Sequence, residues 1–316
     1  MTPPSEGFTI EEVRTLTSPG GTAMSRRIGN RIRLASLAWL VGLSTLTQAQ
    51  DKPAPPAAKG QRVLSAGHSF HVFMPAILKD MALGAEIKDH VQVDTQSIGG
   101  SRVIQHWDLA DEKNKAKTAL KTGKVDVFTL SPIYLPDEGI ARFTQLALEH
   151  NPEIRLTVQE FWLPYDLYDP TRKKADKPDR NALTGEELRK RHEPYFKSMD
   201  DHVRELNEKH GKTVVHVVPV GQAVIGLREK IIAGQAPGLK TQEELFTDAI
   251  GHVTAPVQAL TAYCHFAVIY RKSPVGLPVP GVLARGKLAE GEKLNRLLQE
   301  LAWEAAVGHP LSGVKP

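Results

Sequence analysis

The chain has 316 residues, of which 41% are hydrophobic and 24% are charged, so it is long and apolar enough to bury a sizeable core. Its formal net charge is +4, which falls to +2 when residues 1–49, with their five Arg and three acidic residues, are left out. So balanced a charge argues against a surface built for nucleic acid or for an anionic membrane.

Residues 1–61 lack the apolar periodicity of a folded domain. Residues 24–49 have the layout of a secretory signal peptide, with a basic start, an apolar stretch and small residues before a cleavage point. We therefore expect residues 1–23 to be an upstream extension and residues 50–61 to be a Pro/Ala-rich linker. The mature protein is then expected to be secreted or periplasmic, without a membrane span. A retained N-terminal anchor is the alternative.

Residues 62–316 alternate short β-branched runs with longer helical patterns, which is typical of a parallel sheet covered by helices on both faces. We expect one α/β domain with a three-layer α/β/α architecture and a flavodoxin-like, doubly wound parallel sheet of about five strands. The predicted strands are residues 62–66, 91–97, 125–130, 154–161 and 213–220.

Helices are predicted where apolar residues recur every three or four positions. The first follows the first strand, with Pro75 in its opening turn and Gly84 at its end. Thr184 followed by Glu187 has the form of a capping box and predicts the start of a long helix. The later predicted helices are residues 184–210, 255–270 and 290–307.

The loop after the first predicted strand reads GHSFH, residues 67–71. Ligands of such sheets bind outside the carboxyl ends of the strands, so this loop is a candidate site. Ser69 would lie near a helix N-terminus, where free N–H groups favour an oxyanion and an activated nucleophile. The alternative is that Ser69 only caps the helix.

Two other strand-end loops carry useful groups. Gly99 and Gly100 follow the second strand, and their backbone can approach a ligand and offer N–H donors, although a plain tight turn explains them equally well. Ser131 follows the third strand.

A serine nucleophile needs a general base and a group that orients that base. Asp248 and His252 lie together just before the helix predicted at residues 255–270. A neutral imidazole can take the serine proton, and a carboxylate on its other nitrogen sets the tautomer. An Asp and a His four residues apart also occur by chance or for structural reasons.

The order of these motifs resembles the SGNH (GDSL-like) hydrolase superfamily, over about residues 62–278. The resemblance implies that Ser69 is the nucleophile, His252 the base and Asp248 its orienting carboxylate. It implies an oxyanion hole made by Ser69, by Gly100 or Gly99, and by Ser131. It also implies a serine esterase that needs no metal or organic cofactor.

The sequence departs from the family pattern at three points. Ser131 lies where the family has an Asn, and three residues separate Asp248 from His252 where the family has two. We expect Gly251 to absorb the extra residue as a bulge. His68 replaces the usual Asp or Asn before the serine, and we expect it to be a packed or surface histidine.

Residues 164–199 form a polar excursion that is too long for an ordinary strand–helix connection. Its basic run at 172–180 is predicted to be a solvated loop. Trp162 and Tyr165 are candidate substrate-binding residues that could stack on a sugar. Aromatic side chains that anchor the excursion to the core are the alternative.

Two classes of function remain open. The first is an esterase acting on a small-molecule or carbohydrate ester, such as an acetylated sugar; the second is a weak or inactive member that serves as a carbohydrate-binding or scaffold module. A separation of about 3 to 4 Å between Ser69 Oγ and a ring nitrogen of His252 would favour the enzyme.

A metal-dependent hydrolase is a weaker third hypothesis. Several histidines offer nitrogen ligands, but no recognised zinc spacing joins them to a carboxylate. The single cysteine, Cys264, excludes an internal disulfide and a cysteine-based zinc site, and its apolar surroundings predict an inert, buried thiol. The sequence predicts no nucleic-acid partner and no particular oligomeric state.

Overall fold

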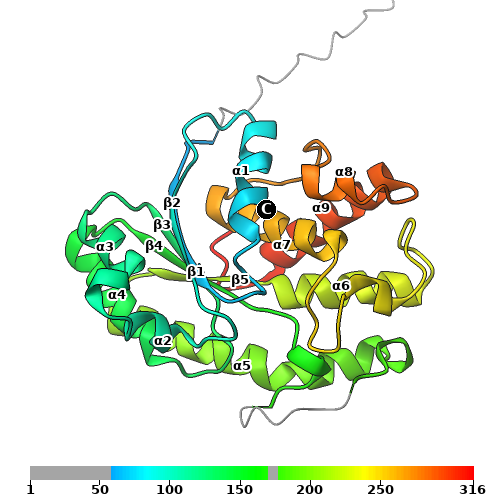
Figure 1. Ribbon diagram of the computed structural model, residues 1–316, viewed down its shortest axis with the longest axis horizontal. Coiled ribbons are helices and arrows are strands. Elements are labelled where there is room, and N and C mark those ends of the chain that lie inside the picture. Colours follow the sequence, from blue (N-terminus) through cyan, green and yellow to red (C-terminus); the bar gives the residue numbers. More distant parts are fainter. Residues whose placement is uncertain (1–57, 170–176) are drawn as a thin grey trace, which may run out of the picture. The chain divides into compact units, whose positions relative to one another are not determined.

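The computed structural model describes residues 58–169 and 177–316 (Figure 1). The predicted extension, the signal peptide and most of the linker lie outside these residues. The described strands form one parallel sheet in the order β2-β1-β3-β4-β5, which confirms the predicted flavodoxin-like, doubly wound α/β fold. The strands are β1 (Arg62–Gly67), β2 (Val91–Ser97), β3 (Val127–Leu130), β4 (Arg155–Gln159) and β5 (Val215–Val218).

Helices cover both faces of this sheet. α1, α7 and α9 pack together on one face, whereas α3, α4 and α5 lie on the other (Figure 1). The helices are α1 (Met74–Gly84), α2 (Val103–Trp107), α3 (Lys115–Lys121), α4 (Glu138–His150), α5 (Gly185–Lys209), α6 (Val220–Ile232), α7 (Ala255–Tyr270), α8 (Gly281–Arg285) and α9 (Gly291–Gly308). The arrangement confirms the three-layer prediction.

Local sequence signals explain several of these boundaries. The Thr184 hydroxyl accepts a hydrogen bond from the Glu187 amide, and the Glu187 carboxylate accepts one from the Thr184 amide, so the predicted capping box is present at the start of α5. The fifth strand is shorter than predicted because Pro219 ends it and Val220 already begins α6. Residue 220 therefore belongs to a helix.

The two edges of the sheet differ. β2 is an open edge whose Val91 and Val93 side chains are partly exposed. β5 is buried along its length, and the amide of Val217 donates to the carbonyl of Leu311 in the C-terminal segment. That segment therefore covers an edge that would otherwise be open to pairing with another chain.

Candidate active site

Ser69 lies in a turn between β1 and α1. The amides of His71 and Val72 both donate to the carbonyl of His68, and α1 begins only at Met74. The residue at the N-cap of α1 is Phe73, so Ser69 does not cap the helix, which corrects that alternative; the turn that carries Ser69 leads directly into α1. β1 pairs with β2 on one side and with β3 on the other, so this turn follows the strand at the topological switch point of the sheet.

The structure brings Ser69, His252 and Asp248 together. Ser69 Oγ lies 2.8 Å from His252 Nε2, and His252 Nδ1 lies 2.6 Å from Asp248 Oδ2. Because a carboxylate only accepts, Nδ1 carries the proton of the neutral ring, and Nε2 can accept the Ser69 hydroxyl. Ser69 is exposed, and the side chains of His252 and Asp248 are 38% and 42% exposed. The three groups are therefore linked and open to a ligand.

Gly251 accommodates the longer Asp–His spacing. Its φ of +108° lies in a region that favours glycine, and its amide donates to Asp248 Oδ1 at 2.8 Å. The His252 amide donates to the same oxygen at 3.1 Å. Partial burial works to raise the pKa of the Asp248 carboxyl, but the hydrogen bonds from the His252 ring and these amides outweigh it and hold the pKa below its usual value.

Three successive carbonyls of this loop accept hydrogen bonds from Trp162 and from two residues of the polar excursion. Arg180 Nη2 donates to the carbonyl of Ala249 at 2.9 Å, the Tyr165 amide to that of Ile250 at 3.0 Å, and Trp162 Nε1 to that of Gly251 at 2.7 Å. Trp162 is 1% exposed and stacks on Phe70, so it cannot offer its ring to a sugar as predicted; it holds the loop instead. Tyr165 is partly exposed and stays a candidate substrate contact.

A buried ion cluster supports these contacts. Asp166 receives a bidentate pair from Arg228 at 2.6 and 3.0 Å and lies 3.7 Å from Arg180 Nε, and all three side chains are 1% exposed. Tyr165 and Asp166 both have φ above +50°, an unusual backbone that the cluster helps to stabilise. Arg180 ends the basic run predicted to be a solvated loop, and its burial corrects that prediction for this residue.

A second buried network lies beneath the Ser69 turn. Gln159 Oε1 accepts from His71 Nδ1 and from His265 Nε2, each at 2.9 Å, and Gln159 Nε2 donates to the carbonyl of Phe70 at 3.0 Å. Burial lowers the pKa of His71 to about 4 and lowers that of His265 well below its usual value, so both rings are neutral. The network ties the residue after Ser69 to β4 and α7.

The other predicted oxyanion groups lie in the loops after β2 and β3, which are on opposite sides of the strand that leads to Ser69. Gly99 and Gly100 are exposed at the end of β2, Gly100 has a φ of +59°, and a Cβ at either position would meet nothing within 4 Å. The Ile98 amide donates to the carbonyl of Gly67, which holds this loop beside the Ser69 turn. Ser131 follows β3 directly and is 1% exposed.

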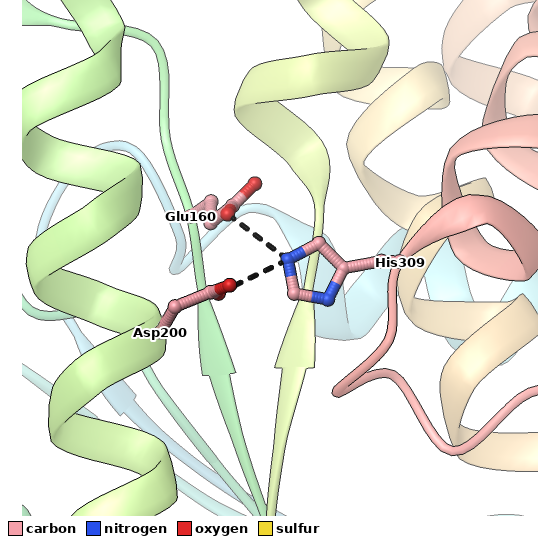
Figure 2. Close-up of side chains that lie close together, drawn as sticks. All are labelled: Glu160, Asp200 and His309. Carbon is pink, nitrogen blue, oxygen red and sulfur yellow. Dashed lines mark ion pairs between the residues drawn. The ribbon is translucent and has the colours of Figure 1, made fainter.

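Glu160, Asp200 and His309 form a separate buried cluster (Figure 2). Among the described residues they are the group whose metal-ligating atoms come within 4.8 Å of one another. His309 Nε2 points at both carboxylates, at 3.4 Å from Glu160 and 3.3 Å from Asp200 (Figure 2). A protonated ring places its positive charge beside both carboxylates, so we interpret the cluster as an ion triad that holds the end of α9 against α5 and the residue after β4.

This triad predicts a pH dependence of stability. Burial works to lower the pKa of His309, but the two carboxylates outweigh it and raise the pKa to about 9. Because the pKa is higher in the folded state, protonated His309 stabilises the fold. The full contribution is present at a pH below the unfolded-state pKa of about 6.5, and it is lost as the pH rises through about 9. We expect the free energy of unfolding, measured with urea, to fall by roughly 2 kcal/mol between about pH 7.5 and 9.5.

The His309→Gln variant should be less stable than the wild type at pH 7.5 and nearly flat over the same range, because it retains no titrating ring. His150→Gln, which changes an exposed histidine at the end of α4, is the matched control and should keep the wild-type slope of unfolding free energy against pH.

The Leu311 amide donates a hydrogen bond to His309 Nδ1 at 3.2 Å, and a doubly protonated ring would lose this contact. A flat wild-type profile would mean that this amide keeps the ring neutral.

The parallel sheet order and the contacts among Ser69, His252 and Asp248 agree with what the resemblance to SGNH (GDSL-like) hydrolases predicts. Among solved structures, the chain is similar to one described as a GDSL-like lipase from Parabacteroides merdae, with 12% identity, a TM-score of 0.40, and coverage of 67% of this chain and 96% of that one. It is also similar to phospholipase A1 from Streptomyces albidoflavus, with 13% identity, a TM-score of 0.39, and coverage of 67% and 99%.

No protein-family model matches the chain, and no curated protein matches it. Across residues 58–169 and 177–316, no helix combines the length and the apolar character needed to cross a membrane.

Proposed function

We propose that this protein is a serine ester hydrolase that transfers a small acyl group first to Ser69 and then to water. The observation that carries the proposal is the continuous hydrogen-bond chain from Ser69 Oγ to His252 and on to Asp248, with separations of 2.8 and 2.6 Å. The 2.8 Å contact is what the active-enzyme hypothesis requires of a nucleophile and its base.

In the proposed reaction, His252 Nε2 takes the Ser69 proton as Oγ attacks the ester carbonyl carbon. The backbone amides of Ser69 and Gly100, together with the Ser131 hydroxyl, would donate hydrogen bonds to the carbonyl oxygen as it becomes negatively charged. The imidazolium, stabilised by Asp248, gives its proton to the departing alcohol. Water then attacks the acyl-enzyme in the same way and releases the acid.

For the substrate, we propose a small acyl ester of a polar alcohol, such as an acetylated carbohydrate. The exposed position of Ser69 and His252 supports an alcohol portion that extends into solvent. Tyr165 is partly exposed, and its amide donates to the carbonyl of Ile250 in the loop that carries His252, so its ring could face such an alcohol. The signal-like residues 24–49 support action outside the cytoplasm, although they lie outside the described residues.

The test is labelling with a fluorophosphonate probe, read by peptide mass spectrometry. We expect a single adduct on Ser69 that disappears in the His252→Ala variant and persists in His150→Ala, which removes an exposed histidine on α4. The absence of an adduct, under conditions that label a known serine hydrolase, would favour the binding or scaffold module instead.

A further inference from the structure

Ser131 and His68 face each other across neighbouring strands. His68 follows β1 and Ser131 follows β3, and the two strands are paired up to Ala66 and Leu130. Ser131 Oγ lies 3.1 Å from His68 Nε2, and the residues are 1% and 2% exposed. Since His68 immediately precedes Ser69, this contact lies directly beside the proposed nucleophile.

The surroundings of His68 determine which nitrogen carries its proton. The ring packs against Phe70 and Phe161, with centroids 5.6 and 5.7 Å away, which holds its orientation. The Phe70 amide donates to Nδ1 at 3.3 Å. Because an amide N–H can only donate, Nδ1 presents a lone pair, and the proton of the neutral ring is on Nε2. Nε2–H therefore donates to the Ser131 oxygen.

This bond restricts the directions in which the Ser131 hydroxyl can point its own proton. With one lone pair occupied by His68, the hydroxyl directs its own O–H elsewhere, and its oxygen makes the His68 contact alone among the described residues. A hydroxyl usually rotates to suit its partners, which makes it a weaker oxyanion donor than a fixed amide. Here the histidine removes the orientation in which Ser131 would donate to the ring.

We propose that His68 is a positioning residue that holds the Ser131 hydroxyl as an oxyanion donor, so that the His68–Ser131 pair does the work of a single side-chain amide. The proposal rests on the proposed ester hydrolysis at Ser69. It gives His68 a part in the reaction that is more specific than packing, and it explains how a serine serves at a position that demands a well-oriented donor.

The kinetic test is a double-mutant cycle on a small acetate ester. We expect Ser131→Ala to lower kcat by about 10²-fold with little change in KM, as for the loss of one oxyanion donor. His68→Phe should lower kcat by roughly 10-fold or more, because the Ser131 hydroxyl can then rotate away. The double variant should be no slower than Ser131→Ala, since His68 then has no hydroxyl to orient. If the kcat losses of the two single variants multiplied in the double variant, His68 would act independently of Ser131 and the proposal would be overturned.

The tautomer can be read without any turnover. ¹⁵N NMR of the wild-type protein should show His68 protonated at Nε2 and not at Nδ1, with the resonance assigned by its loss in His68→Phe. If that variant does not fold, assignment through the neighbouring backbone signals keeps the measurement available. A proton on Nδ1 would overturn the inference even in an active esterase. The expected tautomer without any Ser69-dependent turnover would instead refute the proposed function, and the role of His68 with it.

Discussion

Ser69→Ala is expected to lower kcat for p-nitrophenyl acetate by at least about 10⁴-fold, because the variant cannot form the acyl-enzyme. The oxyanion donors on the backbone remain in place, so a small residual rate above that in water is expected. The measurement is steady-state turnover together with release of acetate from an acetylated sugar, which separates enzymatic hydrolysis from the ready breakdown of an activated ester.

The same substitution should hardly change stability. Ser69 is exposed and its hydroxyl bonds to His252, so its removal should alter the free energy of unfolding by less than ~1 kcal/mol. Ser198→Ala, which removes a hydroxyl on α5, is the matched control and should keep full activity. Wild-type turnover in a folded Ser69→Ala protein would mean that another group performs the chemistry.

The sheet could be predicted from sequence because short runs rich in β-branched and apolar residues alternate with helical patterns. β1, β3, β4 and β5 are almost entirely buried, so each strand is distinct from the polar segments around it. Strand ends were less certain, since a buried run continues into the next element where the backbone changes direction. Val220 shows this: it is as apolar as the strand before it, and only Pro219 indicates the change to a helix.

The contacts among Ser69, His252 and Asp248 could be predicted because the order of these residues along the chain resembles the SGNH pattern, although each motif taken alone had a structural alternative. The arrangement that holds the His252 loop could not. Arg180 and Asp166 look like ordinary solvated charges in the sequence, and only their contacts with each other and with Arg228 explain their burial. Trp162 was misassigned for a related reason, since the pattern does not say whether an aromatic ring faces a ligand or holds a backbone carbonyl.

The same limit applies to His68 and to the ion triad. His68 and Ser131 are 63 positions apart, and Glu160 and His309 directly follow β4 and α9. Pairs so distant in the chain need the strand register before their distance can be known. Local sequence pattern is enough to predict the helices and strands of this protein, whereas the polar side-chain contacts between them can be known only from the three-dimensional structure.

Asp248→Asn is expected to lower kcat by about 10³- to 10⁴-fold, although Asn has nearly the same shape as Asp. The reason lies in the two amides that bind Asp248 Oδ1. Gly251 and His252 donate to that oxygen at 2.8 and 3.1 Å, so an Asn must place its carbonyl there and its NH₂ group toward His252. A donor facing Nδ1 forces the ring proton onto Nε2, which then faces Ser69 and can no longer accept its proton.

This outcome can be checked by turnover and by the ring tautomer. ¹⁵N NMR of His252 should show the proton on Nδ1 in the wild type and on Nε2 in Asp248→Asn, while KM changes little. Asp201→Asn, which alters an exposed aspartate paired with Lys197 on α5, is the matched control and should behave as the wild type. If Asp248→Asn retained most of its kcat, another acceptor would have to orient His252. The role of Asp248 would then be structural: it would stabilise the turn by accepting hydrogen bonds from the amides of Gly251 and His252, and it would not orient the histidine ring.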